Sequence, residues 1–291
     1  MIRALLACLL LLASAACGER AAVAPSPDAR PALWAVEDQR GAVAGWLFGT
    51  IHALPDGASW ETPELASVIA LTGVLVVEAS DLDPEHVGAT LERLARDSPG
   101  PPLAKRLPPG PREDLSELLS DKGVEADRFD GLESWAAALA LSRLAGTAST
   151  ENGVDKALLR RFAGRPVVEL EGAAGQLAIF DGLPEPDQRR LLAAVLAERG
   201  DPAADARQLA KAWLIGDLVQ LEATTRRGLL ADPGLYKALA ADRNRAWLAK
   251  LLPMFKSDRK PLVAVGTAHM LGPEGLPALI AASDYTVRRL Q

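Results

Sequence analysis

The chain has 291 residues, of which 49% are hydrophobic and 24% charged, and its formal net charge is −6. This composition is typical of a globular protein that is long enough to bury one large core or two small ones. The net charge is acidic and the arginines are scattered, so we expect neither nucleic acid nor an anionic membrane surface as a partner.

The first residues have the pattern of an export signal. The stretch MIRALLACLLLLASAACGER has one early arginine, then an apolar run, then small residues, and the apolar run is shorter than the about 20 residues that span a bilayer. We predict a signal peptide over residues 1–16 and lipidation of Cys17, because Ala15-Ala16-Cys17 resembles a lipobox in which Ser14 stands where leucine is usual. Cleavage after Ala15 without a lipid is the alternative.

Export would place the chain in the bacterial cell envelope. Residues 17–31 have few large apolar groups and contain three prolines, which predicts a tether behind the lipid anchor. Gly18 rather than aspartate follows the cysteine, which favours the outer membrane, with the protein facing the periplasm. The lipid is then the only expected membrane contact. No cysteine follows Cys17, so the folded body can have neither a disulfide nor a thiolate metal ligand.

The body, residues 32–291, reads as one α/β domain. Two strands flank a turn at residues 39–41, a helix begins near Pro63, and VLVVEAS is a short apolar strand. Residues 84–163 are mostly helical, with an interruption at PGPPLAKRLPPGP. A strand at RPVVELEG precedes helices over residues 173–250, and KPLVAVGTAH, GPEGLPALIAAS and DYTVRRL give a strand, a helix and a last strand.

This alternation of strands and helices predicts the fold class. We expect a central mixed β-sheet with flanking helices and a large helical insertion between the sheet halves.

A short phrase occurs twice in the chain. GTIHAL contains His52 and GTAHML contains His269, and each follows an apolar strand. One histidine after an apolar run is more often structural than a ligand, but two in the same context point to a shared site. The glycine three residues before each histidine lets a backbone or a ligand approach the strand end. His86, the third histidine, follows Pro84 closely in a polar context and is left out of the predicted site.

Two further apolar strands end in a carboxylate. Glu78 closes VLVVEAS and Glu171 closes VVELEG, although either could simply be solvated or cap a helix. Ligands of open α/β sheets bind outside the carboxyl ends of the strands, so we expect these groups to meet His52 and His269 there.

Two imidazoles and a carboxylate suit a divalent metal such as Zn²⁺, Mn²⁺, Fe²⁺ or Co²⁺. We therefore predict a metal site formed by His52, His269 and Glu78. The metal would polarise a carbonyl oxygen and acidify a bound water. Glu78 and Glu171 can exchange roles, because whichever does not bind the metal can take the proton of the water.

The helix predicted at ALAADRNRAWLAKLL carries polar residues on an apolar face. Asn244 shares that face with Trp247 and Leu251, so its amide needs hydrogen-bond partners. A loop backbone could supply them. Alternatively Asn244, with the neighbouring Arg243, orients a metal ligand or binds a substrate carbonyl or carboxylate.

At these residues the sequence resembles the TraB/GumN family, which includes the Tiki metalloproteases. The resemblance covers the body from Leu33 to Leu290. It is carried by several motifs in order: GTIHALPDG, VVEAS, ENGVDKALL, VVELEGAAGQLAIFDGLP, AWLIGDL, DRNRAW and VAVGTAHMLGPEGLPALI.

The resemblance implies a shared α/β core with an active site at His52, Glu78 and His269, supported by Arg243 and Asn244. For the Tiki branch it implies peptide cleavage supported by manganese or cobalt. It also implies kinship with erythromycin-esterase-like proteins and with haem-binding ChaN-like proteins.

Three functions are open at this point. The first is an exported metal-dependent hydrolase of peptides or proteins, with Mn, Co or Zn as its cofactor. The second is a non-catalytic envelope protein that holds haem, a metal or a peptide in the same pocket. The third is a purely structural use of the Gly-Thr turns and buried histidines.

Overall fold

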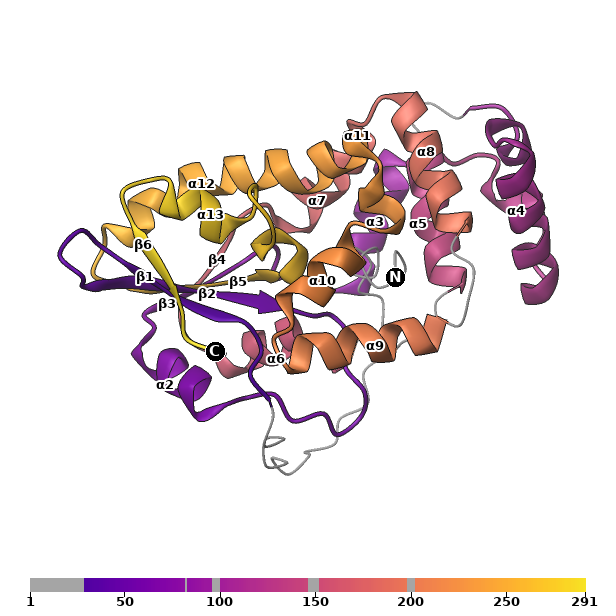
Figure 1. Ribbon diagram of the computed structural model, residues 1–291. Helices are drawn as coiled ribbons and strands as arrows, with labels where there is room; N and C mark the ends of the chain where they lie inside the picture. The colour runs from indigo at the N-terminus through magenta and orange to yellow at the C-terminus, as the bar shows by residue number, and fades with distance from the viewer. Residues whose placement is uncertain (1–28, 82, 96–99, 146–151, 198–201) are drawn as a thin grey trace.

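The structure is a computed structural model (Figure 1). It describes residues 29–81, 83–95, 100–145, 152–197 and 202–291. The predicted signal peptide and the lipidation of Cys17 lie outside these ranges. Within them, no helix combines the length and the apolar character needed to cross a bilayer.

The centre of the molecule is a six-stranded sheet in the order β4-β3-β5-β2-β1-β6. β1 pairs antiparallel with β2 and with β6, whereas β2, β5, β3 and β4 run parallel to one another. The sheet is therefore mixed, as the sequence predicts. The strands are β1 (Leu33–Glu37), β2 (Val43–Thr50), β3 (Val74–Val77), β4 (Val167–Glu169), β5 (Pro261–Gly266) and β6 (Thr286–Arg289).

Two helical runs separate the parallel strands. The predicted insertion between the sheet halves is confirmed by four helices between β3 and β4: α3 (Pro84–Leu94), α4 (Pro109–Lys122), α5 (Ser134–Ala145) and α6 (Val154–Arg161). The second run, between β4 and β5, comprises α7 (Gly172–Asp181), α8 (Glu185–Leu196), α9 (Pro202–Leu214), α10 (Leu218–Thr225), α11 (Pro233–Tyr236) and α12 (Asp242–Phe255). The remaining helices are α2 (Pro63–Leu71), after β2, and α13 (Leu276–Ala281), before β6.

Short helices of other types link these elements. The predicted interruption after α3 contains the 3₁₀ helix η2 (Leu103–Arg106) and the start of α4, whose prolines are tolerated in a first turn. The other linking helices are η3 (Ala126–Phe129), η4 (Gly228–Ala231), the π-helical η5 (Lys237–Ala241) and η6 (Thr267–Met270).

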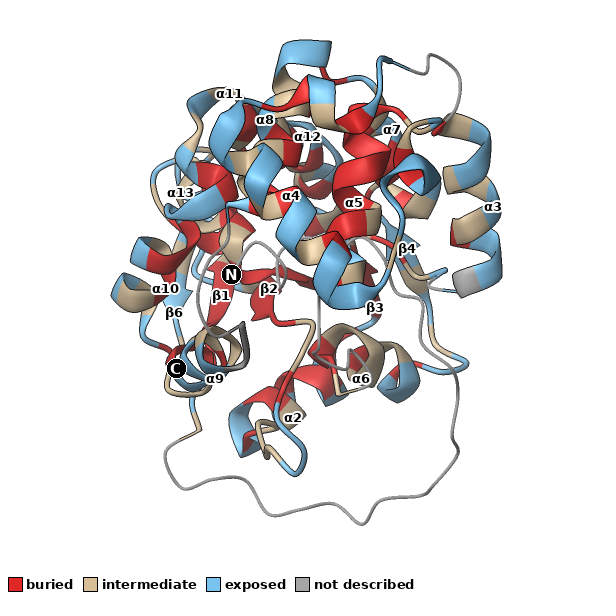
Figure 2. Cartoon of the chain, turned by 90° about the vertical axis from the view of Figure 1, so that its right-hand side faces the viewer, coloured by how far each residue is buried: buried red, intermediate tan, exposed pale blue. Residues whose placement is uncertain are grey.

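The two faces of the sheet are covered by different helices. Along β1, Leu33 and Trp34 belong to different core clusters, as expected where successive side chains alternate between faces. One cluster joins the strands to α2, α6 and α9, and the other joins them to α12 and α13. Figure 2 shows the buried strands between these layers.

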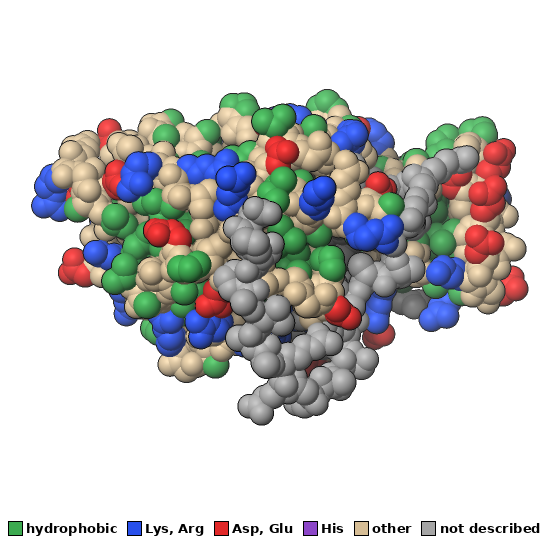
Figure 3. Space-filling view, turned by 60° about the horizontal axis from the view of Figure 1, so that its bottom comes forward, with side chains coloured by type: hydrophobic (Ala, Val, Ile, Leu, Met, Phe, Trp, Pro, Cys, Tyr) green, Lys and Arg blue, Asp and Glu red, His purple; other side chains and the backbone are tan. Residues whose placement is uncertain are grey.

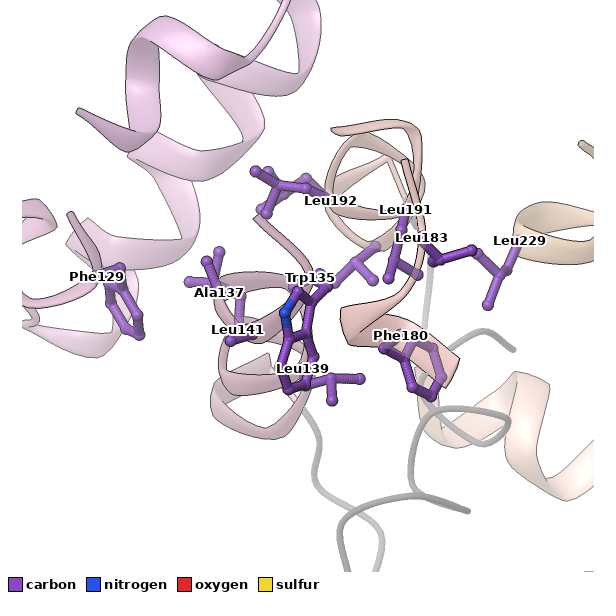
Figure 4. Close-up of a cluster of buried hydrophobic side chains, with 14 of the residues drawn as sticks. Phe129, Trp135, Ala137, Leu139, Leu141, Phe180, Leu183, Leu191, Leu192 and Leu229 are labelled. Atoms are coloured by element: carbon purple, nitrogen blue, oxygen red, sulfur yellow. The ribbon is translucent and has the colours of Figure 1, made fainter. Parts of the chain in front are cut away.

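A third apolar cluster lies beyond the carboxyl edge of the sheet (Figure 1). Its centre is Trp135 of α5, whose ring stacks on that of Phe180 in α7 with 6.5 Å between centroids (Figure 4). α6 does not join this cluster. Val154 and Leu158 of α6 belong instead to the cluster on the face of the sheet that α2 and α9 cover. The first turn of α6 therefore lies next to the end of β2.

β4 is more exposed than the other parallel strands. β4 has the apolar sequence of a buried strand, but it is the edge strand of the sheet, and Val168 is 37% exposed. It also ends at Glu169, so Glu171 lies in the connection to α7. On the face in Figure 3, Lys and Arg side chains are spread over most of the surface, and several Asp and Glu side chains gather at the right-hand end.

Candidate active site at the carboxyl edge of the sheet

The four predicted strand-end side chains lie at the same edge of the sheet. Because β4, β3, β5 and β2 are parallel neighbours in that order, their carboxyl ends are adjacent. Glu171, Glu78, His269 and His52 follow these four ends in the same order. The structure therefore brings these side chains together, as the sequence predicts, whereas His86 is exposed on α3 and pairs with Asp81.

The two Gly-Thr phrases pack directly against each other. A Cβ atom on Gly49 would lie 2.9 Å from Oγ1 of Thr267, so only glycine lets the second phrase approach this closely. The Thr267 hydroxyl donates a 2.8 Å hydrogen bond to the carbonyl of Thr50. These contacts fix the relative positions of the segments that carry His52 and His269.

Gly266, the glycine of the second phrase, lies next to side chains of the predicted site, whereas Gly49 lies next to the other phrase. Its backbone, with φ −49° and ψ 136°, is open to any residue. However, a Cβ here would lie 3.3 Å from Oε1 of Glu78, 3.6 Å from Nε2 of His52 and 3.9 Å from Cδ2 of His269. The three predicted metal ligands thus surround one small space that the missing side chain leaves open.

The guanidinium of Arg243 lies among the same groups. Its Nη2 donates to Oε2 of Glu78 at 2.7 Å and to Oε2 of Glu171 at 2.8 Å, and its Nε donates to Oε1 of Glu171 at 2.9 Å. Its Nη1 donates to the carbonyl of Leu239 at 3.1 Å and lies 3.2 Å from Nε2 of His269. These contacts account for all five N–H bonds of the side chain.

These contacts determine the tautomer of His269. A guanidinium can only donate, so Nε2 of His269 accepts and the ring proton resides on Nδ1. Nδ1 then donates to Oδ1 of Asn244 at 2.7 Å. The Asn244 amide also donates to the carbonyl of Glu274 at 2.7 Å, which is the loop contact predicted as one alternative. The other alternative, a role in metal or substrate binding, stays a prediction.

His269 is held neutral in this setting. Burial and the adjacent Arg243 lower its pKa to about 3, and its ring packs 4.4 Å from that of Trp247. Both nitrogen atoms of the ring are engaged, one by Asn244 and one by Arg243.

Glu78 is ionised although it is buried. Burial alone would raise its pKa, but Arg243, His269, His52 and the N–H of Gly266 outweigh this effect and lower the pKa to about 2. Because His269 is neutral at physiological pH, Arg243 is the dominant stabilising cation. Oε2 also accepts from Gln176, whereas Oε1 accepts from the Gly266 N–H at 2.8 Å beside the open space.

His52 is oriented by a carboxylate that the sequence did not single out as a site residue. Its Nδ1 lies 2.7 Å from Oδ2 of Asp155, in the first turn of α6. Thr50 donates to the other oxygen of Asp155 at 2.5 Å. Nε2 of the same ring lies on the side of Gly266, 3.6 Å from the position that a Cβ atom would have there.

Asp155, Trp247 and Gln176 contact the predicted site residues, and the motifs alone did not assign a role to any of the three. Asp155 occurs in the ENGVDKALL motif, but no spacing relates this motif to His52. Trp247 lies on the predicted core face of α12, and its indole N–H donates to Oε1 of Glu171 at 2.8 Å. A core position in the sequence does not reveal that a tryptophan also pairs with a carboxylate.

The chemistry of the donors suits a divalent metal only in part. His52 Nε2 and Glu78 Oε1 face the same space, and each is held by a partner on its other side, an arrangement common around metal ligands. The third predicted donor, His269 Nε2, accepts from Arg243 instead. In the part of the chain that the structure describes, no cluster of three His, Cys, Asp or Glu side chains is arranged for a metal.

Comparison with known proteins places this site in a family. Residues 32–289 match the profile of the TraB/PrgY/gumN family. The chain is 27% identical over 239 residues to the uncharacterized protein YbaP of Escherichia coli K12 and to that of Shigella flexneri, which covers 80% of this chain and 86% of each relative. No solved structure matches the chain significantly. The family match extends over the whole sheet and all the site residues, and the chain belongs to the TraB/PrgY/gumN family.

Proposed function

We propose that the chain is an exported hydrolase of peptides or proteins in which His52 activates a water molecule beside Gly266. The observation that carries this proposal is the Asp155–His52 pair, with 2.7 Å between Oδ2 and Nδ1. Nε2 of the same ring lies beside Gly266, where Oε1 of Glu78 also lies. Carboxylate–imidazole pairs of this kind act as general bases in many hydrolases.

In the proposed reaction, the oxygen of the water attacks the carbonyl carbon of the substrate and its proton passes to Nε2 of His52. The carboxylate of Asp155 stabilises the resulting imidazolium. Glu78 accepts a hydrogen bond from the other hydrogen of the water and so orients its lone pair. His52 then returns the proton to the leaving amine, which completes the cleavage and restores the neutral imidazole.

The divalent metal, Mn, Co or Zn, stays a prediction. His52 and Glu78 would hold it through Nε2 and Oε1, the two donors that face the Gly266 space. Such an ion, when bound, acidifies a water and polarises a carbonyl group. The roles of Arg243, Glu171 and Asn244 in this proposal are to position Glu78 and His269.

Incubation of the purified protein with a peptide library, followed by mass spectrometry of the products, tests this function. We expect His52→Gln and Asp155→Asn to reduce product formation by about 10²–10⁴-fold, the usual contribution of a positioned base. His86→Gln, on the exposed side of α3, should cleave like the wild type. Equal cleavage by His52→Gln and the wild type would exclude His52 as the base.

One observation favours the alternative of a binding protein that holds haem, a metal or a peptide. Hydrolases present donors to the oxyanion that forms on the substrate, but all N–H bonds of Arg243 are already engaged. Retention of one of these ligands through gel filtration, with no product from any peptide, would support this alternative against the hydrolase.

The location in the cell envelope is a separate proposal. The leader predicts lipidation at Cys17, so Cys17→Ser should move the protein from the membrane fraction to the soluble fraction. A variant that stays with the membrane would contradict the lipid anchor.

A further inference from the structure

We infer that a second binding site lies at the starts of α5 and α8, and that it takes the primary ammonium group of a small ligand. A cavity of about 260 Å³ is present there, and the residues that line it are Gly100, Glu133, Ser134, Glu185, Gln188 and Arg189. None of them belongs to the candidate active site at Gly266. The inference is therefore independent of the proposed hydrolase.

The walls of this cavity are held by hydrogen bonds between the two helices. The Gln188 side chain accepts from the N–H of Trp135 at 3.2 Å and donates to the carbonyl of Leu183 at 3.0 Å. The Ser134 hydroxyl donates to Oε1 of Glu185 at 3.0 Å. The cavity is therefore formed in advance, as small-molecule sites usually are.

One carboxylate at the cavity is buried and has no hydrogen-bond partner. Glu133, directly before α5, is only 9% exposed. Its N–H donates to the carbonyl of Ala95 and its carbonyl accepts from the N–H of Ala137, so only its side chain is available to a ligand. Among the described residues, this side chain makes no hydrogen bond and no salt bridge. Buried charges are normally paired, because an unpaired one costs free energy, so the position suits a cation from outside the chain.

The buried Arg106 attracts Glu133 but does not pair with it. Its guanidinium donates instead to three backbone carbonyls, those of Pro101, Asp130 and Leu132. The charge of Arg106 thus acts on Glu133 from a greater distance. The other charged side chains around Arg106 are three carboxylates and one guanidinium, those of Asp130, Glu133, Glu185 and Arg189. One negative charge is left over.

The oxygen atoms that remain open at the cavity belong to carboxylates. Oε1 of Glu185 accepts from the Ser134 hydroxyl and from Nε of Arg189. In the described parts of the chain, nothing donates to Oε2 of Glu185 or to the Glu133 carboxylate. An ammonium group has three N–H donors and no acceptor, so it matches this surface in charge and in hydrogen bonding.

The size of the cavity also limits the ligand. Its volume of about 260 Å³ is below the about 300–1,000 Å³ typical of sites for drug-sized molecules, which favours an ammonium group on a short alkyl stem. A bare divalent ion matches less well. No three His, Cys, Asp or Glu side chains of the described residues are arranged to hold one.

Titration of the purified protein with n-butylammonium chloride, followed by amide NMR spectra, tests this site. We expect chemical-shift changes centred on Gly100, Ser134 and Gln188. Glu133→Gln should weaken binding at least about tenfold, the usual effect of losing a hydrogen bond to a charged group. Glu64→Gln removes an exposed glutamate from the first turn of α2 and should bind like the wild type. It controls for the loss of a negative charge at a helix start.

Two further ligands and one further variant sharpen the test. n-Butanol has the same stem without the charge and should bind at least about tenfold more weakly. Nα-Acetyl-lysine methylamide tests whether a lysine side chain on a peptide enters as well as a free amine, and binding of either ammonium compound supports the site. If Glu133→Gln does not fold, Glu133→Asp takes its place, because its shorter side chain should also weaken binding.

The inference is overturned if neither ammonium compound binds, or if n-butanol binds as tightly as n-butylammonium. It is also overturned if the folded variant at Glu133 keeps the affinity of the wild type.

Discussion

The two Gly-Thr-x-His phrases are nearly identical in sequence but have different environments. His52 pairs with the carboxylate of Asp155 and directs Nε2 towards the space at Gly266. His269 pairs with the neutral amide of Asn244, and its Nε2 accepts from Arg243. Burial and the adjacent guanidinium lower the pKa of His269 to about 3. The comparison shows that the same short motif places one histidine beside a carboxylate and the other between a neutral amide and a guanidinium.

The largest expected effect is the loss of stability when Arg243, which contacts His269, is replaced. Arg243→Ala would leave Glu78 and Glu171 buried without their counter-charge, and breaking a buried pair in this way costs about 3–5 kcal/mol. Urea unfolding of the variant measures the loss. Arg245→Ala, on the exposed face of the same helix, should cost about 1 kcal/mol or less, and similar losses for the two variants would contradict the central role of Arg243.

The next largest effect is the difference in stability between alanine substitutions at the two histidines. His269→Ala leaves an Arg243 N–H and the Asn244 carbonyl without partners, so we expect it to lower the free energy of unfolding by about 1–3 kcal/mol. His52→Ala removes one contact of Asp155, whose side chain is 17% exposed and still accepts from Thr50, so we expect a loss at the lower end of that range, about 1 kcal/mol. Thermal and urea unfolding of both variants would refute the comparison if the order were reversed.

The space at Gly266 can be filled without changing either histidine. Gly266→Ala would place a methyl group 3.3 Å from Glu78 Oε1 and 3.6 Å from His52 Nε2. We expect overpacking to lower the free energy of unfolding by about 1–3 kcal/mol. Metal binding and product formation should also be lost, because the methyl group would occupy the space between Glu78 Oε1 and His52 Nε2. Gly88→Ala in α3, where nothing lies within 4 Å of the added carbon, is the control. Normal binding and activity in Gly266→Ala would show that the chemistry occurs elsewhere.

Counted per pH unit, the pH dependence of stability is the smallest of these effects. His269 has a pKa of about 3 in the folded chain against about 6.5 when unfolded. The unfolded chain therefore takes up the proton first as the pH falls. The stabilisation is complete above about pH 6.5 and declines towards about pH 3, by at most about 1.4 kcal/mol per pH unit. Unfolding free energies of wild type and His269→Gln at several pH values should differ by this slope, and equal slopes would contradict a neutral buried His269.

Much of the site could be predicted from the sequence because it follows from the sheet. An apolar strand that ends in a polar residue indicates both the strand and the position just beyond it, and parallel strands place those positions at one edge. This reasoning places His52, Glu78, Glu171 and His269 together. The amphipathic face of α12 likewise predicts a buried Asn244, which the structure confirms.

The partners of these residues could not be predicted in the same way. Asp155 reaches His52 from a helix of the insertion, and Arg243 reaches Glu78 from α12. Both contacts depend on how helices pack against the sheet, which no spacing along the chain records. For the same reason the sequence suggests a metal between the carboxylate and the imidazole, whereas the structure has a guanidinium hydrogen-bonded to both groups.

The position of β5 has a consequence for how the molecule is completed during synthesis. This strand lies between β3 and β2 although it is the fifth in the chain, so the middle of the sheet is vacant until residues 261–266 have been made. A chain stopped before that point would present two strands, β2 and β3, with unsatisfied backbone edges. The four parallel strand ends can therefore meet at one edge only after residues 261–266 have been made.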